Sequence, residues 1–255
     1  MVLIDTHCHL YLADFMQDVG KVIEQAKKVG VKKFYFPAID STEHDAMLLL
    51  ESKYPNECVA MMGLHPCSVK ANYKEELLLV EQWVERRKFA AIGEIGLDFY
   101  WDTTYKKEQY DSFEFQMNIA LNKNLPIVIH TRNAMEETIN CVKPFSDKGL
   151  RGIFHCFGGS YEEAKKIIDL GFLLGIGGVI TYKKAGLDKV LDKIDLQHIV
   201  IETDAPYLTP VPFRGKRNES SYLQYIIASL ANIKGVSEEE VASITTTNAE
   251  KLFVL

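Results

Sequence analysis

The chain has 255 residues, 47% of them hydrophobic and 25% charged, with a formal net charge of −6 at neutral pH. This composition is ordinary for a globular protein and excludes disordered and fibrous classes, and the negative balance excludes a broad, sequence-independent attraction to nucleic acid. The length is close to the ~250 residues typical of one α/β barrel, so we expect a single domain over residues 1–255.

The cysteines and the apolar runs bear on location. Five cysteines with irregular spacing and no Cys-x-x-Cys pair argue against a disulfide framework. No apolar run approaches the ~18 residues of a membrane span, and the chain starts with a strand pattern in place of a signal peptide. We therefore predict a cytoplasmic protein with reduced thiols and no membrane partner, and no pattern indicates an obligate protein partner.

Short β-rich apolar runs alternate with amphipathic stretches, which is typical of βα units around a parallel sheet. Eight such units favour a closed (β/α)8 TIM barrel over an open doubly wound sheet, which would need a Gly-x-Gly-x-x-Gly turn after the first strand. The predicted strands are residues 2–5, 33–39, 58–63, 90–94, 127–130, 151–155, 172–177 and 198–202. The predicted helices are residues 15–29, 75–87, 106–124, 134–142, 162–170, 187–194, 221–232 and 237–252.

The first strand ends in His7-Cys8-His9. Side chains at i and i+2 leave a strand on the same face, so His7 and His9 can point together at one metal ion. The same alternation is expected to turn Cys8 away from the two histidines, and Cys156 away from His155.

Further metal-ligand side chains fall at the ends of later strands, and active sites of such barrels lie at that rim. Five of the seven histidines belong to this group, whereas His44 lies in a helical stretch and His198 lies at the opposite end of the last strand. Chance would scatter these residues, so we expect one functional site. Its members are His7, His9, His65, Glu94, His130, His155 and Asp204.

Four imidazoles and two carboxylates are too many ligands for one tetrahedral zinc ion and suit two divalent ions. Glu94 is the expected bridge between them. Nitrogen and oxygen ligands without thiolate allow Mg²⁺, Mn²⁺ or Zn²⁺. The other expected ligands are His7, His9 and Asp204 for one ion, and His130 and His155 for the second.

Three residues are candidates for substrate binding. Arg132 and Arg214 could hold a phosphate, because a guanidinium pairs with phosphate through two parallel hydrogen bonds. His65 has no obvious place among the six ligands, so we expect it to donate to a substrate phosphate.

These residues resemble the TatD family of metal-dependent deoxyribonucleases, which are metal-dependent hydrolases on a (β/α)8 barrel. The resemblance covers essentially the whole chain. It implies a nuclease that cleaves phosphodiesters, often from a 3′ end, with metal ligands at His7, His9, Glu94, His130, His155 and Asp204. The motifs that carry it are Ile4-Asp5-Thr6-His7-Cys8-His9-Leu10, Gly93-Glu94-Ile95-Gly96-Leu97-Asp98, His130, His155-Cys156-Phe157, Glu202-Thr203-Asp204-Ala205-Pro206-Tyr207-Leu208, Arg214-Gly215-Lys216-Arg217-Asn218-Glu219 and Asn248-Ala249-Glu250-Lys251-Leu252-Phe253.

The leading hypothesis is a deoxyribonuclease, acting as a 3′–5′ exonuclease, in which a hydroxide bound by two metals attacks phosphorus. Asp204 would accept the proton of the water and Glu94 would hold the ions together. One alternative is an amide or ester hydrolase, such as an aminoacyl-tRNA deacylase, because the same ions can direct water to a carbonyl. Another is a non-catalytic metal-binding scaffold, although the presence of all six ligands counts against it.

Overall fold

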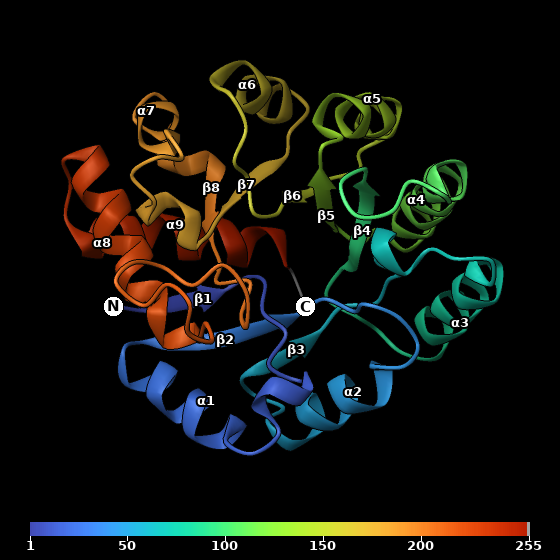
Figure 1. Ribbon diagram of the computed structural model, residues 1–255, viewed down its shortest axis with the longest axis horizontal. Coiled ribbons are helices and arrows are strands. Elements are labelled where there is room, and N and C mark those ends of the chain that lie inside the picture. Colours follow the sequence, from blue (N-terminus) through green and yellow to red (C-terminus); the bar gives the residue numbers. More distant parts are fainter. Residues whose placement is uncertain (254–255) are drawn as a thin grey trace.

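The eight apolar runs become eight strands, each followed by a helix, in a computed structural model that describes residues 1–253. Together they form a (β/α)8 barrel, as the sequence predicts (Figure 1). The strands are β1 (Leu3–Asp5), β2 (Val31–Phe36), β3 (Cys58–Ala60), β4 (Ile92–Asp98), β5 (Ile127–Arg132), β6 (Gly152–Phe154), β7 (Leu173–Ile176) and β8 (Ile199–Ile201).

The strands form two hydrogen-bonded sheets, β1–β2–β3 and β4–β5–β6–β7–β8, and two bridges between these sheets close the barrel. Met62 bridges to Ile92 between the third and fourth strands, and Cys8 bridges to Ala205 just beyond the first and eighth. All neighbouring strands pair in parallel. The carboxyl ends of all eight strands therefore meet at one rim, where side chains from distant parts of the sequence can converge.

The helices form a ring outside the strands (Figure 1). Every predicted helix is found, although its ends shift. The first starts at Val19 because Ala13–Phe15 forms a 3-10 turn that buries Phe15. The helices are α1 (Val19–Lys28), α2 (His44–Lys53), α3 (Tyr73–Arg86), α4 (Lys106–Lys123), α5 (Met135–Ser146), α6 (Tyr161–Asp169), α7 (Leu187–Leu191), α8 (Leu223–Lys234) and α9 (Glu238–Leu252).

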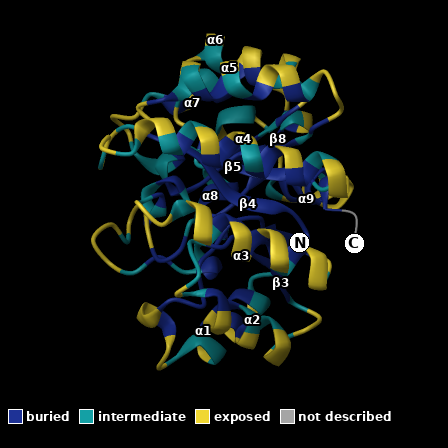
Figure 2. Ribbon diagram, turned by 90° about the vertical axis from the view of Figure 1, so that its right-hand side faces the viewer, coloured by how far each residue is buried: buried dark blue, intermediate teal, exposed yellow. Residues whose placement is uncertain are grey.

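Burial follows this layering, with the strands dark and the outer faces of the helices exposed in Figure 2. On α1, Val22, Ile23 and Ala26 are buried against the barrel. On α2, Met47 and Leu50 are buried whereas Leu49 is 71% exposed. This broken apolar stripe agrees with the sequence analysis, which expects a helical stretch at His44 but gives no range for it.

The last helix, α9, covers the amino ends of the strands. Asn248 Nδ2 donates to Ile199 O at 2.7 Å, and Thr246 Oγ1 donates to Val2 O at 2.8 Å. This helix closes the end of the barrel opposite the rim. All five cysteines are free thiols, and within residues 1–253 no helix has the length and apolarity to cross a membrane.

The fourth and fifth strands run beyond their predicted ends. Gly96 pairs with His130, and Asp98 pairs with Arg132. A Cβ atom at Gly96, where φ is +145°, would lie 2.0 Å from His130 O, so the close approach requires glycine. The extended ladder carries Glu94, Asp98, His130 and Arg132 to the rim.

Candidate metal centre

The seven side chains that the sequence predicts at the rim all meet there. They come from six strands and surround the mouth of the barrel, where a cavity of about 790 Å³ opens. His7 lies fully buried beneath the cavity, and the other six line it. The seven are His7 and His9 after β1, His65 after β3, Glu94 on β4, His130 on β5, His155 after β6 and Asp204 after β8.

Glu94 lies at the centre of this group and divides its two carboxylate oxygens between two sets of imidazoles. Its Oε2 is 3.1 Å from His7 Nε2 and 3.6 Å from His9 Nε2. Its Oε1 is 2.9 Å from His130 Nδ1 and 3.0 Å from His155 Nε2. One carboxylate thus faces two groups of imidazole nitrogens at once, as a carboxylate that bridges two metal ions would.

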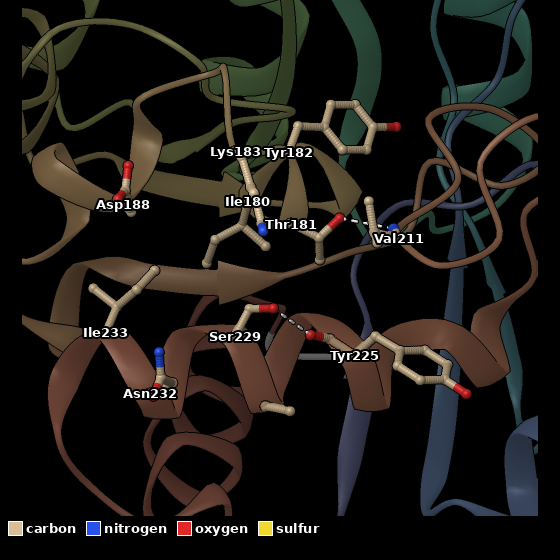
Figure 3. Close-up of a pocket in the computed structure, with 11 residues that line it drawn as sticks. Ile180, Thr181, Tyr182, Lys183, Asp188, Val211, Tyr225, Ser229, Asn232 and Ile233 are labelled. Atoms are coloured by element: carbon tan, nitrogen blue, oxygen red, sulfur yellow. Dashed lines mark hydrogen bonds between the residues drawn. The ribbon is translucent and has the colours of Figure 1, made fainter.

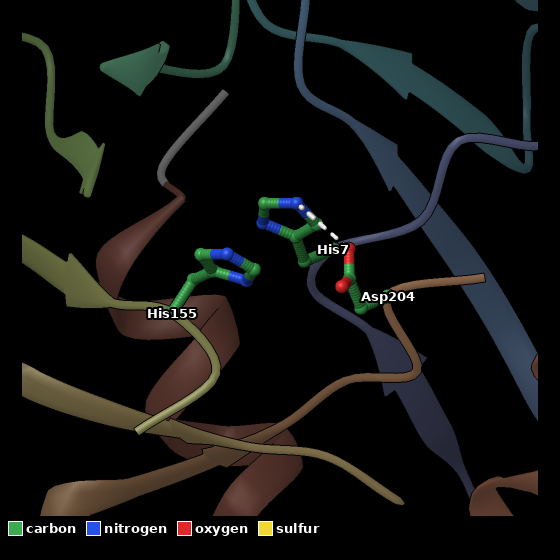
Figure 4. A group of neighbouring side chains, drawn as sticks. All are labelled: His7, His155 and Asp204. Carbon is green, nitrogen blue, oxygen red and sulfur yellow. Dashed lines mark ion pairs between the residues drawn. The ribbon is translucent and has the colours of Figure 1, made fainter. Parts of the chain in front are cut away.

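Asp204 completes the first group from the end of β8, the strand that lies beside β1. Its Oδ1 lies 3.6 Å from Nε2 of both His7 and His9, and its backbone N–H donates to His7 O at 2.9 Å. Figure 4 shows this carboxylate beside His7, whose ring stacks on that of His155 with centroids 3.8 Å apart. The ends of β1, β6 and β8 therefore share one small volume.

The charges in this volume compensate one another. Burial would raise the pKa of Glu94, but His155, His7 and His65 hold it well below its usual range. Burial would lower the pKa of His155, but Glu94 and Glu202 outweigh it and raise the pKa well above the usual value. Because a cation must compete with protons for these ligands, we expect metal uptake to release protons.

Hydrogen bonds fix which nitrogen of His9 is free. Tyr11 Oη donates to Pro37 O at 2.6 Å, so it accepts from His9 Nδ1 at 2.9 Å. This network assigns the proton of the neutral ring to Nδ1. The lone pair of Nε2 is then directed toward Glu94 and Asp204, as a metal ligand requires.

Two carboxylates fix, in the same way, which nitrogens of His130 and His155 are free. Asp98 Oδ2 accepts from His130 Nε2 at 2.8 Å, and Glu202 Oε1 accepts from His155 Nδ1 at 3.2 Å. In the neutral rings the other nitrogens, His130 Nδ1 and His155 Nε2, present lone pairs to Glu94 Oε1. A carboxylate behind a ligating histidine orients the ring and raises its basicity.

His65 differs from these histidines. Its Nδ1 accepts from the backbone N–H of Cys67 at 3.0 Å, so the neutral ring carries its proton on Nε2. That nitrogen lies 3.4 Å from Glu94 Oε1 and 3.3 Å from His130 Nδ1. His65 is therefore arranged as a hydrogen-bond donor inside the cavity.

The sequence patterns do not mark Tyr11, Asp98 and Glu202 as site residues. The i+2 spacing that links His7 and His9 continues to Tyr11, so that signal was present. Asp98 and Glu202 stand in quoted motifs, but their partners lie 32 and 47 residues away in the chain. Only the barrel brings each carboxylate to its histidine.

The expectation for Cys156 is wrong. Its φ of +49° takes it out of the extended conformation, so alternation fails and the residue lines the cavity beside His155. The expectation for Cys8 is correct, because its thiol is buried and points at Tyr35 O on β2.

The two candidate arginines occupy different places. Arg132 lines the cavity at its outer end. Arg214 is exposed, is not among the cavity-lining residues, and lies with its guanidinium carbon 4.2 Å from the ring centroid of Tyr182.

A second cavity, of about 500 Å³, opens between the segment after β7 and α8 (Figure 3). Val211 N donates to Thr181 Oγ1 between two of its lining segments, and Ser229 Oγ donates to Tyr225 O within α8. Asp188 is the one carboxylate among its lining residues, which include no histidine. The potential metal ligands gather instead at the barrel mouth.

The donor set at the mouth fits divalent cations. Nε2 atoms of His7 and His9 lie 3.2 Å apart, a contact between two imidazole nitrogens that a shared cation would stabilise. In each of three groups of side chains, the ligand atoms lie within 4.8 Å of one another. These groups are His7–His9–Glu94, His7–His155–Asp204 and His65–Glu94–His130.

Comparisons with known proteins identify relatives of this chain. Residues 4–254 match the family model of TatD-related DNases. The chain is 38% identical to the uncharacterized metal-dependent hydrolase YabD of Bacillus subtilis, with 99% of each chain covered. It is 33% identical to the uncharacterized metal-dependent hydrolase YcfH of Escherichia coli K12, covering 99% of this chain and 96% of YcfH.

A solved structure extends the likeness to the fold. The crystal structure of YJJV, a TatD homolog from Escherichia coli K12, superposes with a TM-score of 0.93 at 30% identity and covers 99% of this chain and 98% of its own. From the family match and this identity over nearly the whole length, the chain belongs to the TatD family of metal-dependent hydrolases.

Proposed function

We propose that the protein is a divalent-metal-dependent deoxyribonuclease that hydrolyses phosphodiester bonds of DNA from a 3′ end. The observation that carries this proposal is the division of Glu94 between two sets of imidazoles at 2.9–3.6 Å. Two adjacent divalent ions suit displacement at phosphorus, where an attacking and a leaving oxygen both carry charge.

The proposed ligands form two sets that share Glu94. When bound, Mg²⁺, Mn²⁺ or Zn²⁺ would lower the pKa of water and polarise a phosphoryl oxygen. The first set is His7, His9, Asp204 and Glu94 Oε2; the second is His130, His155 and Glu94 Oε1.

The remaining chemistry belongs to side chains around these ligands. Burial would raise the pKa of Asp204, but His9, His155 and His7 keep it below its usual value, so the group is ionised at neutral pH. It can therefore accept a proton from an attacking water. His65 Nε2–H is placed to donate to a phosphate oxygen, and Arg132 can hold a neighbouring phosphate at the outer end of the cavity.

The proposal is tested on protein stripped with a chelator and reloaded with Mg²⁺, Mn²⁺ or Zn²⁺. A single strand with a 3′-hydroxyl should be shortened from that end, and chelator should abolish the reaction. The same samples are given aminoacylated RNA. Release of the amino acid without cleavage of DNA would replace the nuclease proposal with the ester hydrolase, and activity on neither substrate would favour the scaffold.

A further inference from the structure

Two neighbouring aromatic side chains stand exposed at the mouth of the cavity. Tyr100 and Trp101, in the loop between β4 and α4, are 51% and 67% exposed. Trp101 also lines the cavity. Exposed Trp beside a polar cavity presents a large apolar face at the edge of the site, where a flat ligand could cover it.

An arginine from the next strand completes this aromatic surface. The guanidinium carbon of Arg132 lies 3.8 Å from the ring centroid of Tyr100 and 5.1 Å from that of Trp101. The two aromatic rings meet edge to face, with centroids 4.9 Å apart. We call these three residues, Tyr100, Trp101 and Arg132, the aromatic platform.

The platform is tied to the metal centre through one carboxylate. Asp98 Oδ1 accepts the backbone N–H groups of Tyr100 at 2.9 Å and of Trp101 at 3.0 Å. Its other oxygen holds His130 Nε2. The side chain of Gln109 bonds to both backbone groups of Asp98 and so fixes the turn from α4. The loop is therefore organised before any ligand arrives.

We propose that the aromatic platform stacks against a nucleobase of the nucleotide next to the scissile phosphate, and so selects unpaired ends over duplex DNA. This inference rests on the proposed nuclease function. Bases stack on aromatic and guanidinium faces whatever their identity, which suits a sequence-independent nuclease. At a duplex end the 3′-terminal base is paired and stacked on its neighbour, so it must first be unpaired and unstacked to reach the platform.

The position of the platform agrees with this role. Arg132 lies two residues beyond His130 on the same strand, so about 7 Å separates their Cα atoms. That is roughly one nucleotide step from His130, a proposed ligand. The chain has a net charge of −6. The positive charge of Arg132 beside the aromatic rings therefore supplies a local attraction for the negatively charged DNA strand.

The first test uses fluorescence. The chain has two tryptophans, so Trp83→Phe on α3 leaves Trp101 as the reporter. The metal-loaded variant is titrated with three probes: a thymidine strand with phosphorothioate linkages that resist cleavage, its blunt duplex, and an abasic strand of equal length. We expect the single strand to quench Trp101 and to bind about tenfold or more tighter than the abasic strand. Absence of quenching by the single strand would overturn the platform.

The second test uses kinetics. Trp101→Ala should raise KM for single-stranded DNA about tenfold while kcat stays within about twofold, because stacking away from the reacting atoms acts as uniform binding. On the abasic strand Trp101→Ala and wild type should be equal. Leu49→Ala, another exposed apolar position but on α2, is the control and should match wild type on both substrates.

The outcomes separate the two proposals. If wild type cleaves DNA and Trp101→Ala behaves like wild type, the platform is wrong and the nuclease stands. If Trp101→Ala raises KM equally on the normal and the abasic strands, the loop has a structural role and the platform proposal is again wrong. If wild type fails to cleave DNA while the single strand still quenches Trp101, the platform stands and the nuclease fails.

Discussion

Glu202 Oε1 lies 3.2 Å from Nδ1 of His155, and both side chains are buried at the end of the barrel interior. The bond assigns the proton of the neutral ring to Nδ1 and leaves Nε2 free to bind a metal. The same carboxylate oxygen accepts the backbone N–H of Cys156. Glu202 thus orients a proposed ligand without reaching the cavity itself.

Removal of this carboxylate should weaken metal binding without removing a ligand. We expect Glu202→Ala to lower affinity for Mn²⁺ or Zn²⁺ about 10- to 100-fold, the usual cost of losing a partner behind a ligating histidine. Calorimetric titration of stripped protein measures it. Glu162→Ala, an exposed carboxylate on α6, is the control, and equal affinities in the two variants would remove the positioning role.

The bridging role of Glu94 predicts a difference in metal content. Glu94→Ala should lower occupancy at both positions, because its two oxygens face both sets of histidines. His155→Ala should lower metal occupancy mainly at one of the two positions. Elemental analysis of the purified variants counts the ions. Loss of a single ion from Glu94→Ala would contradict the bridge.

Asp204→Asn tests the proposed base. The amide keeps the shape and an acceptor oxygen but loses the basicity, so turnover per bound metal should fall by about 10²–10⁴. Much of the metal should remain, since four histidines and Glu94 still offer ligands. Activity within about fivefold of wild type, well short of that range, would leave Asp204 as a replaceable ligand.

Substitution of Arg132 and of Arg214 should change KM for DNA to different extents. Arg132 lines the cavity whereas Arg214 stacks on Tyr182 outside its lining. Arg132→Ala should raise KM for DNA about tenfold, as expected for loss of charge-assisted bonds to phosphate. We expect Arg214→Ala to raise KM less. The reverse order in steady-state assays would show that the strand runs over Tyr182 instead.

An ion pair near the rim predicts a dependence of stability on pH. The hydrogen bonds from Arg217 lower the pKa of Asp18. A depressed pKa in the folded state means that the pair stabilises the fold above the unfolded pKa, and that this contribution is lost as pH falls through the folded value. Between about pH 5 and pH 3, Asp18→Asn should therefore lose less unfolding free energy than wild type.

Urea unfolding at several pH values across that range measures the slope of the unfolding free energy against pH. Asp147→Asn is the control, because Asp147 is exposed and has no ion-pair partner in the described part of the chain. A slope for Asp18→Asn as steep as that of Asp147→Asn would show that the pair with Arg217 contributes nothing measurable.

The sequence by itself determined the strand order and most of the rim. Apolar runs at βα spacing predict eight strands because period and length are local properties of the chain. The i+2 spacing of His7 and His9 predicts a shared face for the same reason. Parallel strands then bring the residues after each run to one rim, so His130, His155 and Asp204 could be placed there without coordinates.

Tertiary structure alone decided how these residues meet. The register of β4 on β5 pairs Gly96 with His130 and Asp98 with Arg132, and this register is a long-range property that local patterns do not contain. It sets the bond from His130 to Asp98 and brings Arg132 onto Tyr100. The division of the two Glu94 oxygens likewise depends on four strands closing around one side chain, which only the packed barrel imposes.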